Sequence, residues 1–355
     1  MSAAIRVEDV SKRFRLYQDR NQIRAALDPV IAEGEQVGLL NFPNHRNAGD
    51  SALWLAAEDL ISTRPASVSY RCAWNTFDRS SFERQVPTGP IVLNAGGNFG
   101  DLYPGGQQAL REHVLRTMTH RAIIQLPQSI HFVDVANRDR MARLIATHGR
   151  TTILCRDEVS VEIARRHFDA PVAFCPDLVF WLGPFARPAP VVDIVWLART
   201  DPERHFDAPE PAPGLEVFDW LHPHPGEPVW PDGARRAYEI NQRLIAGFGP
   251  APAEGGRLRR ARGRLAAPTF DAIANGWVDR AVRLLGRGRV VVTDRLHAHV
   301  LALLSGIPSV VLDNSYGKVH GVIRTTTIDS PLTHLATSVP DALALAKELV
   351  AGADR

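Results

Sequence analysis

The alternation of short apolar segments with helical patterns from residue 36 onward is the feature that most limits what this chain can fold into. Apolar runs of strand length occur at residues 36–42, 67–71, 90–94, 122–126, 151–155 and 171–174. Apolar residues at helical spacing predict intervening helices at about 50–61, 105–119, 137–148 and 157–168. Continuous apolar strands separated by helices are typical of a parallel sheet covered on both faces. The first half is therefore predicted to form one doubly wound α/β domain.

A second set of strands follows the segment GPFARPAPVVD (183–193), whose three prolines predict a domain boundary. Strands are predicted at 191–197, 289–292 and 309–312, and helices at about 269–286, 295–305 and 339–351. The long part between the first two of these strands is rich in Pro and Trp. Its Gly- and Arg-rich end, residues 251–268, is expected to be a mobile loop. The predicted fold class is α/β, with two doubly wound, Rossmann-like domains that face each other across a cleft.

We expect three parts along the chain: a charged and flexible leader (1–35), an N-terminal α/β domain (36–185) and a C-terminal α/β domain (186–355). In the leader, IRVEDVSKRFRLY resembles the first strand of the ATPase subunits of polysaccharide exporters. The sequence lacks a phosphate-binding loop of the form GxxxxGK followed by Ser or Thr, so ATP hydrolysis is not supported.

Composition excludes several classes of protein. The 355 residues suffice for two domains, and 41 basic against 39 acidic residues do not indicate a nucleic-acid binder. Three widely spaced cysteines are neither a disulfide framework nor a zinc site. The first residues lack the apolar core of a signal peptide, and no apolar run reaches the length of a membrane span. We therefore expect a cytoplasmic protein; if it works on lipid-linked material, it would do so at the inner face of the membrane.

Polar loops follow two predicted strands of the first half. NFPNHRNAGDSALW contains His45, Asn47 and Asp50, and LNAGGNFGDLYPGG contains Asn98 and Asp101. Both loops carry the pattern Asn-x-Gly-Asp, and both follow strands whose carboxyl ends would share one rim of the sheet. Asp and Asn side chains of this kind hold the hydroxyl groups of sugars. The alternative is that the first loop only caps the helix that begins near Asp50.

Three further segments of the first half place polar residues after strands. Gln128 and His131 follow the strand that ends near residue 126, where a lone histidine could equally be structural. Arg156 follows the next strand, and we expect it to form a structural ion pair. Asp177 could face the cleft or could form a Pro-Asp turn.

The second half supplies cations in the same way. Arg199, Arg295 with His297, and Lys318 each follow a predicted strand. A planar guanidinium binds two oxygens of a phosphate or carboxylate at once, so these residues predict an anion pocket, to which the amide groups at a helix start near Arg295 would add. The alternative is a set of surface salt bridges.

Together these motifs resemble the polysaccharide pyruvyl transferase family. The resemblance rests on NHRNAGDSA (44–52), AGGNFGDL (95–102), LPQSIHF (126–132), RDEVS (156–160), CPDLVF (175–180), TDRLHAHVLALLSGIP (293–308) and LDNSYGK (312–318), in family order. One departure is visible: Arg46 and Ala48 stand where Gly and Leu or Ile are common, which bears on acceptor details. The resemblance implies a fold similar to two-domain glycosyltransferases of the B type (GT-B). It also implies transfer of pyruvate from phosphoenolpyruvate to two hydroxyls of a sugar as a ketal, with release of phosphate.

The resemblance assigns roles to residues of both halves. The phosphoenolpyruvate side is the C-terminal domain, where Arg295, Leu296 and His297 match the donor-binding motif and Arg199 matches an arginine at the start of that domain. Lys318 and His131 match positions for donor binding or proton transfer. The acceptor side is the N-terminal domain, with the acceptor-binding candidates His45, Asn47, Asp50, Asn98, Asp101 and Gln128.

In the expected mechanism, Arg199, Arg295 and Lys318 clamp the donor. His297 or His131 supplies a proton, because the ordinary pKa of a histidine, ~6.5, allows it both to donate and to accept protons near neutral pH. Asp50 or Asp101 would orient or deprotonate the acceptor hydroxyl. No cofactor and no metal are expected. The expected partners are phosphoenolpyruvate, a sugar acceptor and, peripherally, membrane-bound biosynthesis or export machinery, but no nucleic acid.

Two alternative functions remain open at this point. A nucleotide-sugar glycosyltransferase of the same fold would also place basic residues in its second domain. A non-catalytic sugar-binding partner of an export system would fit the exporter-like leader and would bind the acceptor without releasing phosphate.

Overall fold

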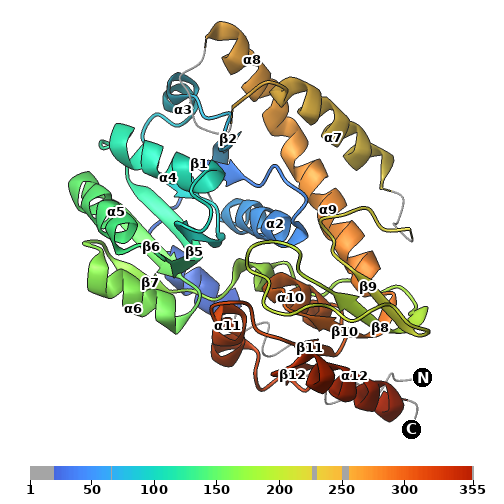
Figure 1. Ribbon diagram of the computed structural model, residues 1–355. Coiled ribbons are helices and arrows are strands. Elements are labelled where there is room, and N and C mark those ends of the chain that lie inside the picture. Colours follow the sequence, from blue (N-terminus) through green and yellow to red (C-terminus); the bar gives the residue numbers. More distant parts are fainter. Residues whose placement is uncertain (1–19, 65, 226–229, 250–255, 354–355) are drawn as a thin grey trace, which may run out of the picture.

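Two parallel β-sheets form the framework of the protein (Figure 1). The computed structural model describes residues 20–64, 66–225, 230–249 and 256–353. The first sheet has the strand order β2-β1-β3-β5-β6-β7, with β4 paired to β5, and the second has the order β12-β11-β10-β8-β9. All named strand pairs are parallel. The predicted α/β fold with two Rossmann-like units is confirmed.

The strands of the first sheet lie within residues 36–185 and those of the second within 186–355. The first set is β1 (Gln36–Phe42), β2 (Ser67–Ala73), β3 (Ile91–Leu93), β4 (Gly96–Gly100), β5 (Ile123–His131), β6 (Thr151–Cys155) and β7 (Val172–Phe174). The second set is β8 (Val192–Leu197), β9 (Leu215–Phe218), β10 (Gly288–Thr293), β11 (Ser309–Val311) and β12 (Thr333–Leu335).

Helices cover both faces of the first sheet and connect the strands of the second. They are α2 (Ala48–Ser62), α3 (Arg79–Gln85), α4 (Gly106–Thr117), α5 (Val135–His148), α6 (Glu158–His167), α7 (Asp232–Ile245), α8 (Arg257–Ala266), α9 (Phe270–Leu285), α10 (Leu296–Leu304), α11 (Lys318–Thr326) and α12 (Val339–Ala353). Two 3₁₀ turns, η1 (Leu178–Trp181) and η2 (Ala267–Thr269), complete the set. None of the helices in the described part of the chain is long and apolar enough to cross a membrane.

Sequence pattern missed strands β4, β9 and β12 and helices α3, α7, α8 and α11. β12 has three residues and β9 has four, too few to show a period, whereas the equally short β3, β7 and β11 were found because they lie in clear apolar runs. The prediction of a mobile loop over 251–268 was wrong for residues 257–266, which form α8, while residues 251–255 lie outside the described part. Arginine is a good helix former, so a run dominated by arginine can be helical without an obvious apolar stripe.

Part of the segment predicted to be a flexible leader is packed against the core. Residues 1–19 lie outside the described residues, but residues 20–27 are helical. Ile23, Leu27 and Ile31 recur every four residues, and all three are buried in the central hydrophobic cluster. Ile23 and Leu27 give the short helix an apolar face, and Ile31, just after the helix, extends the contact, so this segment packs against the core.

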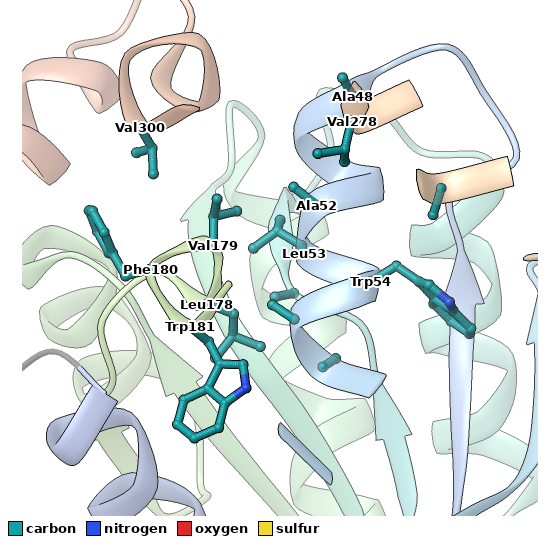
Figure 2. Close-up of a cluster of buried hydrophobic side chains, with 14 of the residues drawn as sticks. Ala48, Ala52, Leu53, Trp54, Leu178, Val179, Phe180, Trp181, Val278 and Val300 are labelled. Atoms are coloured by element: carbon teal, nitrogen blue, oxygen red, sulfur yellow. The ribbon is translucent and has the colours of Figure 1, made fainter. Parts of the chain in front are cut away.

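The two sheets share one hydrophobic core. Helix α2 packs against both α9 and η1, and Figure 2 shows its Ala52 and Leu53 beside Leu178 and Val179. At the other face of α2, Phe42 stacks on Phe270 with a ring-centroid distance of 4.0 Å. The same cluster of buried residues includes strand residues of both sheets. The two halves are therefore held together by interdigitated side chains, and their strand ends are fixed relative to each other.

Truncation of the shared core tests this description. We expect Phe270→Ala to lower the free energy of unfolding by ~3–5 kcal/mol, since it removes a buried ring that contacts both halves. Urea denaturation followed by tryptophan fluorescence and by circular dichroism should give one coincident transition. Val133→Ala, at a side chain that is 74% exposed, is the control and should have little effect. Two separate transitions in the native protein would contradict a common core.

Candidate active site

A cavity of about 620 Å³ lies where the carboxyl ends of strands from both sheets meet. Strand β4 and the segments that follow β1, β2, β4, β6, β8, β9 and β10 contribute to its wall. Nine residues that sequence analysis singled out line it: His45, Asn47, Asp50, Asn98, Arg199, Arg295, Leu296, His297 and Lys318. The wall also includes residues that sequence analysis did not assign to a substrate, among them Trp74, Tyr103, Arg156 and Glu203.

Glu203 is the centre of a buried ion cluster on the second-sheet side. Its Oε2 lies 2.5 Å from Nη1 of Arg199 and 2.8 Å from Nζ of Lys318, and it also accepts a hydrogen bond from Nδ2 of Asn314. Tyr103, from the first half, donates to Oε1 at 3.2 Å. Burial alone would raise the pKa of Glu203, but the charges of Lys318 and Arg199 lower it overall. Glu203 therefore fixes Lys318 and Arg199 while it ties the two halves together.

Arg295 is held by two further carboxylates. Its Nη2 donates to Oδ2 of Asp219 at 2.7 Å, and its Nη1 lies 3.1 Å from Oδ2 of Asp201. Asp219 follows β9, a strand that the sequence pattern did not reveal. The cations of the predicted anion pocket are thus largely neutralised by acidic neighbours, and a surplus of positive charge is not what distinguishes the site.

Arg156, Asp177 and His297 form a second buried cluster in the same wall. Nη1 of Arg156 donates to Oδ2 of Asp177 at 2.7 Å, and that oxygen lies 3.2 Å from Nε2 of His297. Burial by itself would raise the pKa of Asp177, but the charges of His297 and Arg156 hold it well below its ordinary value. The ionised carboxylate can accept a hydrogen bond from Nε2 of His297 and so hold the ring in one orientation. The ion pair expected for Arg156 is present, and Arg156 also faces the cavity.

Gly97 is the point at which these two clusters meet. A β-carbon at this position would lie 2.9 Å from Nζ of Lys318 and 3.0 Å from Nη2 of Arg156. An ammonium and a guanidinium from different parts of the chain thus converge on the bare backbone of one glycine. We call this place the Gly97 face. Its open N–H donors suit a small anion.

Gly49 makes a comparable close approach on the other side of His297. A β-carbon there would overlap the His297 ring at Nδ1. Gly49 belongs to the first turn of α2, and Asn47 caps that helix by accepting a hydrogen bond from its amide at 3.1 Å. The glycine of the first Asn-x-Gly-Asp pattern is therefore required for contact between the two halves.

Asp294 is a buried carboxyl group beside the two arginines. It is 4% exposed, and its Oδ1 has no hydrogen-bond partner among the described residues. Burial raises its pKa to about 6, although the charges of Arg199 and Arg295 act in the opposite direction. When Asp294 is protonated, it no longer supplies a negative charge to balance the positive charges of Arg199 and Arg295.

The first-half side of the cavity carries polar and aromatic groups. Oδ2 of Asp50 accepts a hydrogen bond from Nδ2 of Asn47 at 3.0 Å and lies 3.4 Å from Nε2 of His45. The His45 ring stacks on Trp74, with centroids 6.0 Å apart. The alternative expectation of a helix-capping loop is thus also met, because Asn47 is the N-cap of α2 and Asp50 lies in its first turn.

Asn98 is held rigidly at the cavity wall. Its Oδ1 accepts a hydrogen bond from Nη2 of Arg111 at 2.9 Å, and its Nδ2 donates to Gln107. Gln128 accepts from the backbone amide of Asn98 at 3.3 Å. Gln128 is fully buried because β5 continues to His131 instead of ending near residue 126, with β4 supplying the partner for the extension. Gln128 therefore positions Asn98 from behind the wall.

Asp101 and His131 do not line the cavity. Asp101 accepts backbone hydrogen bonds from Val133 and Asp134, both at 2.8 Å, at the start of α5. His131 stacks on Tyr316 with a centroid distance of 4.2 Å, and burial lowers its pKa. The two Asn-x-Gly-Asp loops thus differ: the aspartate of the first faces the cavity and that of the second binds backbone amides.

Several residues of the site were missed from sequence, and three of them show what signal was available. Glu203 could have been noticed because an acid four residues after Arg199 suits a local ion pair, and Asp219 because it follows the apolar run LEVF. Trp74 follows β2, but a single tryptophan in a loop carries no pattern. Among the described residues, no group of three or more His, Cys, Asp or Glu side chains is arranged to hold a metal ion.

The contact between Gly49 and His297 gives a prediction with a matched control. Gly49→Ala should lower the free energy of unfolding by ~1–3 kcal/mol, because the new methyl group would overlap the His297 ring. Gly233→Ala in α7 has nothing within 4 Å of its new methyl group and should be neutral or stabilising by up to ~1 kcal/mol. Thermal and urea denaturation would measure both. Equal effects of the two substitutions would show that the close approach is unimportant.

The raised pKa of Asp294 predicts a pH dependence. Between about pH 4 and pH 6 the native state should hold a proton that the unfolded state has lost, so stability should fall as pH rises through this window. The Asp294→Asn protein should not show this loss. Between pH 4 and pH 8 its free energy of unfolding should therefore rise by ~2–3 kcal/mol relative to that of the native protein. Urea denaturation across this range, with Asp169→Asn at an exposed position as control, would measure it. Parallel curves for the native and Asp294→Asn proteins would disprove it.

Comparison with known proteins shows what the chain is similar to. The family model described as "Polysaccharide pyruvyl transferase" matches residues 47–316. Pyruvyl transferase 1 of Schizosaccharomyces pombe is 30% identical over 301 residues, which cover 80% of this chain and 68% of that protein. EpsO of Bacillus subtilis is 28% identical over 320 residues, 89% of this chain and 92% of that protein. A crystal structure of an uncharacterized Klebsiella pneumoniae protein aligns with a TM-score of 0.51 at 16% identity, covering 94% of this chain and 100% of that one.

Proposed function

The chain belongs to the polysaccharide pyruvyl transferase family, and from that premise we propose that it uses phosphoenolpyruvate as donor and forms a pyruvate ketal on a sugar acceptor. The enzyme is a transferase. The donor, the ketal product and the roles of individual residues are the substance of the proposal. The observation that carries it is the convergence of Lys318 and Arg156 on the Gly97 face.

Phosphoenolpyruvate is a small molecule with two anionic groups, a phosphate and a carboxylate. The Gly97 face offers it a bare backbone with an ammonium and a guanidinium above it. Each charge-assisted hydrogen bond contributes roughly 1.5–3 kcal/mol. Arg199 and Arg295 line the same cavity, and we propose that they face the second anionic group of the donor.

All four proposed donor-binding cations have acidic neighbours. The site would therefore select phosphoenolpyruvate by directed hydrogen bonds and not by a surplus of positive charge. Arg156 is paired with Asp177, and Lys318 with Glu203. These pairs keep the cationic groups in place before the donor arrives, which reduces the entropy lost on binding. In this proposal the carboxylates act as positioning groups: Glu203 serves Arg199 and Lys318, and Asp201 serves Arg199 and Arg295.

His297 is the proposed proton donor. Its ring lines the cavity, with Nε2 3.1 Å from Nη1 of Arg156 and 3.2 Å from Oδ2 of Asp177. The proton would go to the methylene carbon of phosphoenolpyruvate, which becomes the methyl group of the product. The second histidine predicted for this role, His131, is a weaker candidate because it lies outside the cavity wall and stacks on Tyr316.

The remaining steps place the sugar at the first-half side of the cavity. One acceptor hydroxyl would attack the central carbon of the donor as its methylene carbon gains the proton. Phosphate would then leave, and a second hydroxyl would close the ketal and release its own proton. Asp50 is the proposed group that orients or deprotonates a hydroxyl, with Trp74 and His45 as the aromatic wall against which a sugar ring can stack. We propose that Asp101 does not take part, because its oxygens already bind the start of α5.

The Gly97 face can be tested without removing any charge. Gly97→Ala should weaken phosphoenolpyruvate binding by roughly 10- to 100-fold, because a methyl group would lie between the donor and the two cations. Gly105→Ala is the matched control: it lines the same cavity, but its methyl group would meet nothing within 4 Å. Isothermal titration calorimetry with phosphoenolpyruvate measures binding, and melting temperature checks the fold.

Two outcomes would contradict the proposal. Unchanged binding in Gly97→Ala would remove the donor from the Gly97 face. Binding of a nucleotide sugar in place of phosphoenolpyruvate by the native protein would favour a glycosyltransferase of the same fold. A parallel assay of phosphate release with sugar acceptors separates an enzyme from a non-catalytic sugar-binding protein.

A further inference from the structure

Helix α8 presents an outer face on which arginine and leucine alternate. Arg257, Leu258, Arg264 and Leu265 are all exposed, with Leu258 at 73% and Leu265 at 63%. Leu258, Arg264 and Leu265 follow Arg257 by one, seven and eight residues, which places all four side chains on one side of the helix. Large exposed leucines beside arginines are not needed for solubility or for folding. In Figure 1, α8 lies with α7 at the outer edge of the molecule, so this face is not covered by another described element.

The inner face of α8 is anchored to the cavity wall. Nη2 of Arg259 donates to the backbone carbonyl of Asn75 at 2.6 Å, and Gly263 packs so closely that a β-carbon would lie 3.3 Å from the carbonyl oxygen of Thr76. Both contacts are made with the loop that begins at Trp74, which lines the cavity and stacks on His45. The helix is therefore a rigid extension of the first-half wall, and its outer face has a fixed orientation relative to the cavity.

The charge of this region departs from that of the whole chain. Residues 231–268 contain eight arginines and three acidic residues, whereas the full sequence has a net charge of only +2. Positive charge is thus concentrated on the segment that carries the exposed leucines. An arginine near an anionic lipid surface contributes roughly 1 kcal/mol, which is about fivefold in binding, and apolar side chains add by entering the boundary between headgroups and acyl chains.

We infer that the outer face of α8 is a contact surface for an anionic lipid bilayer, with Leu258 and Leu265 inserted and Arg257 and Arg264 at the headgroups. The mixture of residues favours this partner over others. Nucleic acid or an anionic polysaccharide would be bound by arginine alone and gives no role to two exposed leucines. A helix with an arginine-rich polar side and a leucine edge is instead the arrangement that lies in a membrane interface.

This contact would have a consequence for the site. Bound through α8, the protein would hold the Trp74 side of its cavity next to the lipid surface, where a lipid-carried sugar could enter. That consequence rests on the function proposed above, whereas bilayer binding does not depend on which reaction the cavity performs. Vesicle binding and phosphoenolpyruvate calorimetry therefore test the two proposals separately.

The test is co-sedimentation of the full chain with vesicles of phosphatidylcholine containing phosphatidylglycerol, and with vesicles of phosphatidylcholine alone. We expect binding to the anionic vesicles, weaker binding at high salt and little binding to the neutral ones. Arg257→Gln with Arg264→Gln should lower the partition coefficient by about 25-fold. Leu258→Ser with Leu265→Ser should lower it by roughly tenfold.

Matched controls remove the same kinds of group elsewhere. Arg165→Gln with Arg166→Gln alters two exposed arginines of α6, and Val135→Ser with Val159→Ser alters two exposed apolar side chains of α5 and α6. Both controls should bind as the native protein does, and melting temperatures should be unchanged in all variants. The inference is overturned if the native protein fails to bind anionic vesicles. It is also overturned if the α8 variants bind like the controls, or if arginine-dependent binding is found only with a soluble polyanion.

Discussion

The packing of α2 against α9 and η1 is the contact on which the rest of this structure depends. Helix α2 begins in the loop after the first strand of one sheet, and α9 leads directly into the central strand of the other. Because their buried side chains belong to one cluster, the carboxyl ends of both sheets are held at a fixed separation. The cavity is the space left between these two rims. A pair of domains joined only by a linker would not fix Gly49 against His297, or Gly97 beneath Lys318.

Charge balance is the second principle of the site. The cations that line the cavity are paired with Asp177, Glu203, Asp201 and Asp219. Buried charges without partners are costly, so the folded protein neutralises them and retains their geometry. The N–H groups left to bind a ligand are few, and those of Lys318 and Arg156 converge on Gly97. This arrangement shows how a chain of nearly zero net charge could carry the site that we propose for a donor with two anionic groups.

The fold was largely predictable from sequence, because continuous apolar strands between helices leave few alternatives to a covered parallel sheet. The positions of Arg199, Arg295 and His297 were predictable for the same reason: each follows a strand with a clear apolar run, and the carboxyl ends of parallel strands share one edge. Gln128 and His131 were misplaced because β5 runs past Pro127 to pair with β4, a strand built largely from glycine. Helix α8 was mistaken for a loop because five of its ten residues are arginine, which leaves no clear apolar period.

By itself the sequence determined which polar residues stand at strand ends, since the period of apolar residues marks where each strand stops. It did not determine which of them face the cavity. Asp50 and Asp101 occupy the same position in two copies of one pattern, yet one faces the cavity and the other binds the amides at the start of α5. The partners of Lys318 and Arg156 lie 115 and 141 residues away, at Glu203 and His297. Only the tertiary structure decides such pairs, because they depend on how two sheets pack around a shared core and not on any local pattern.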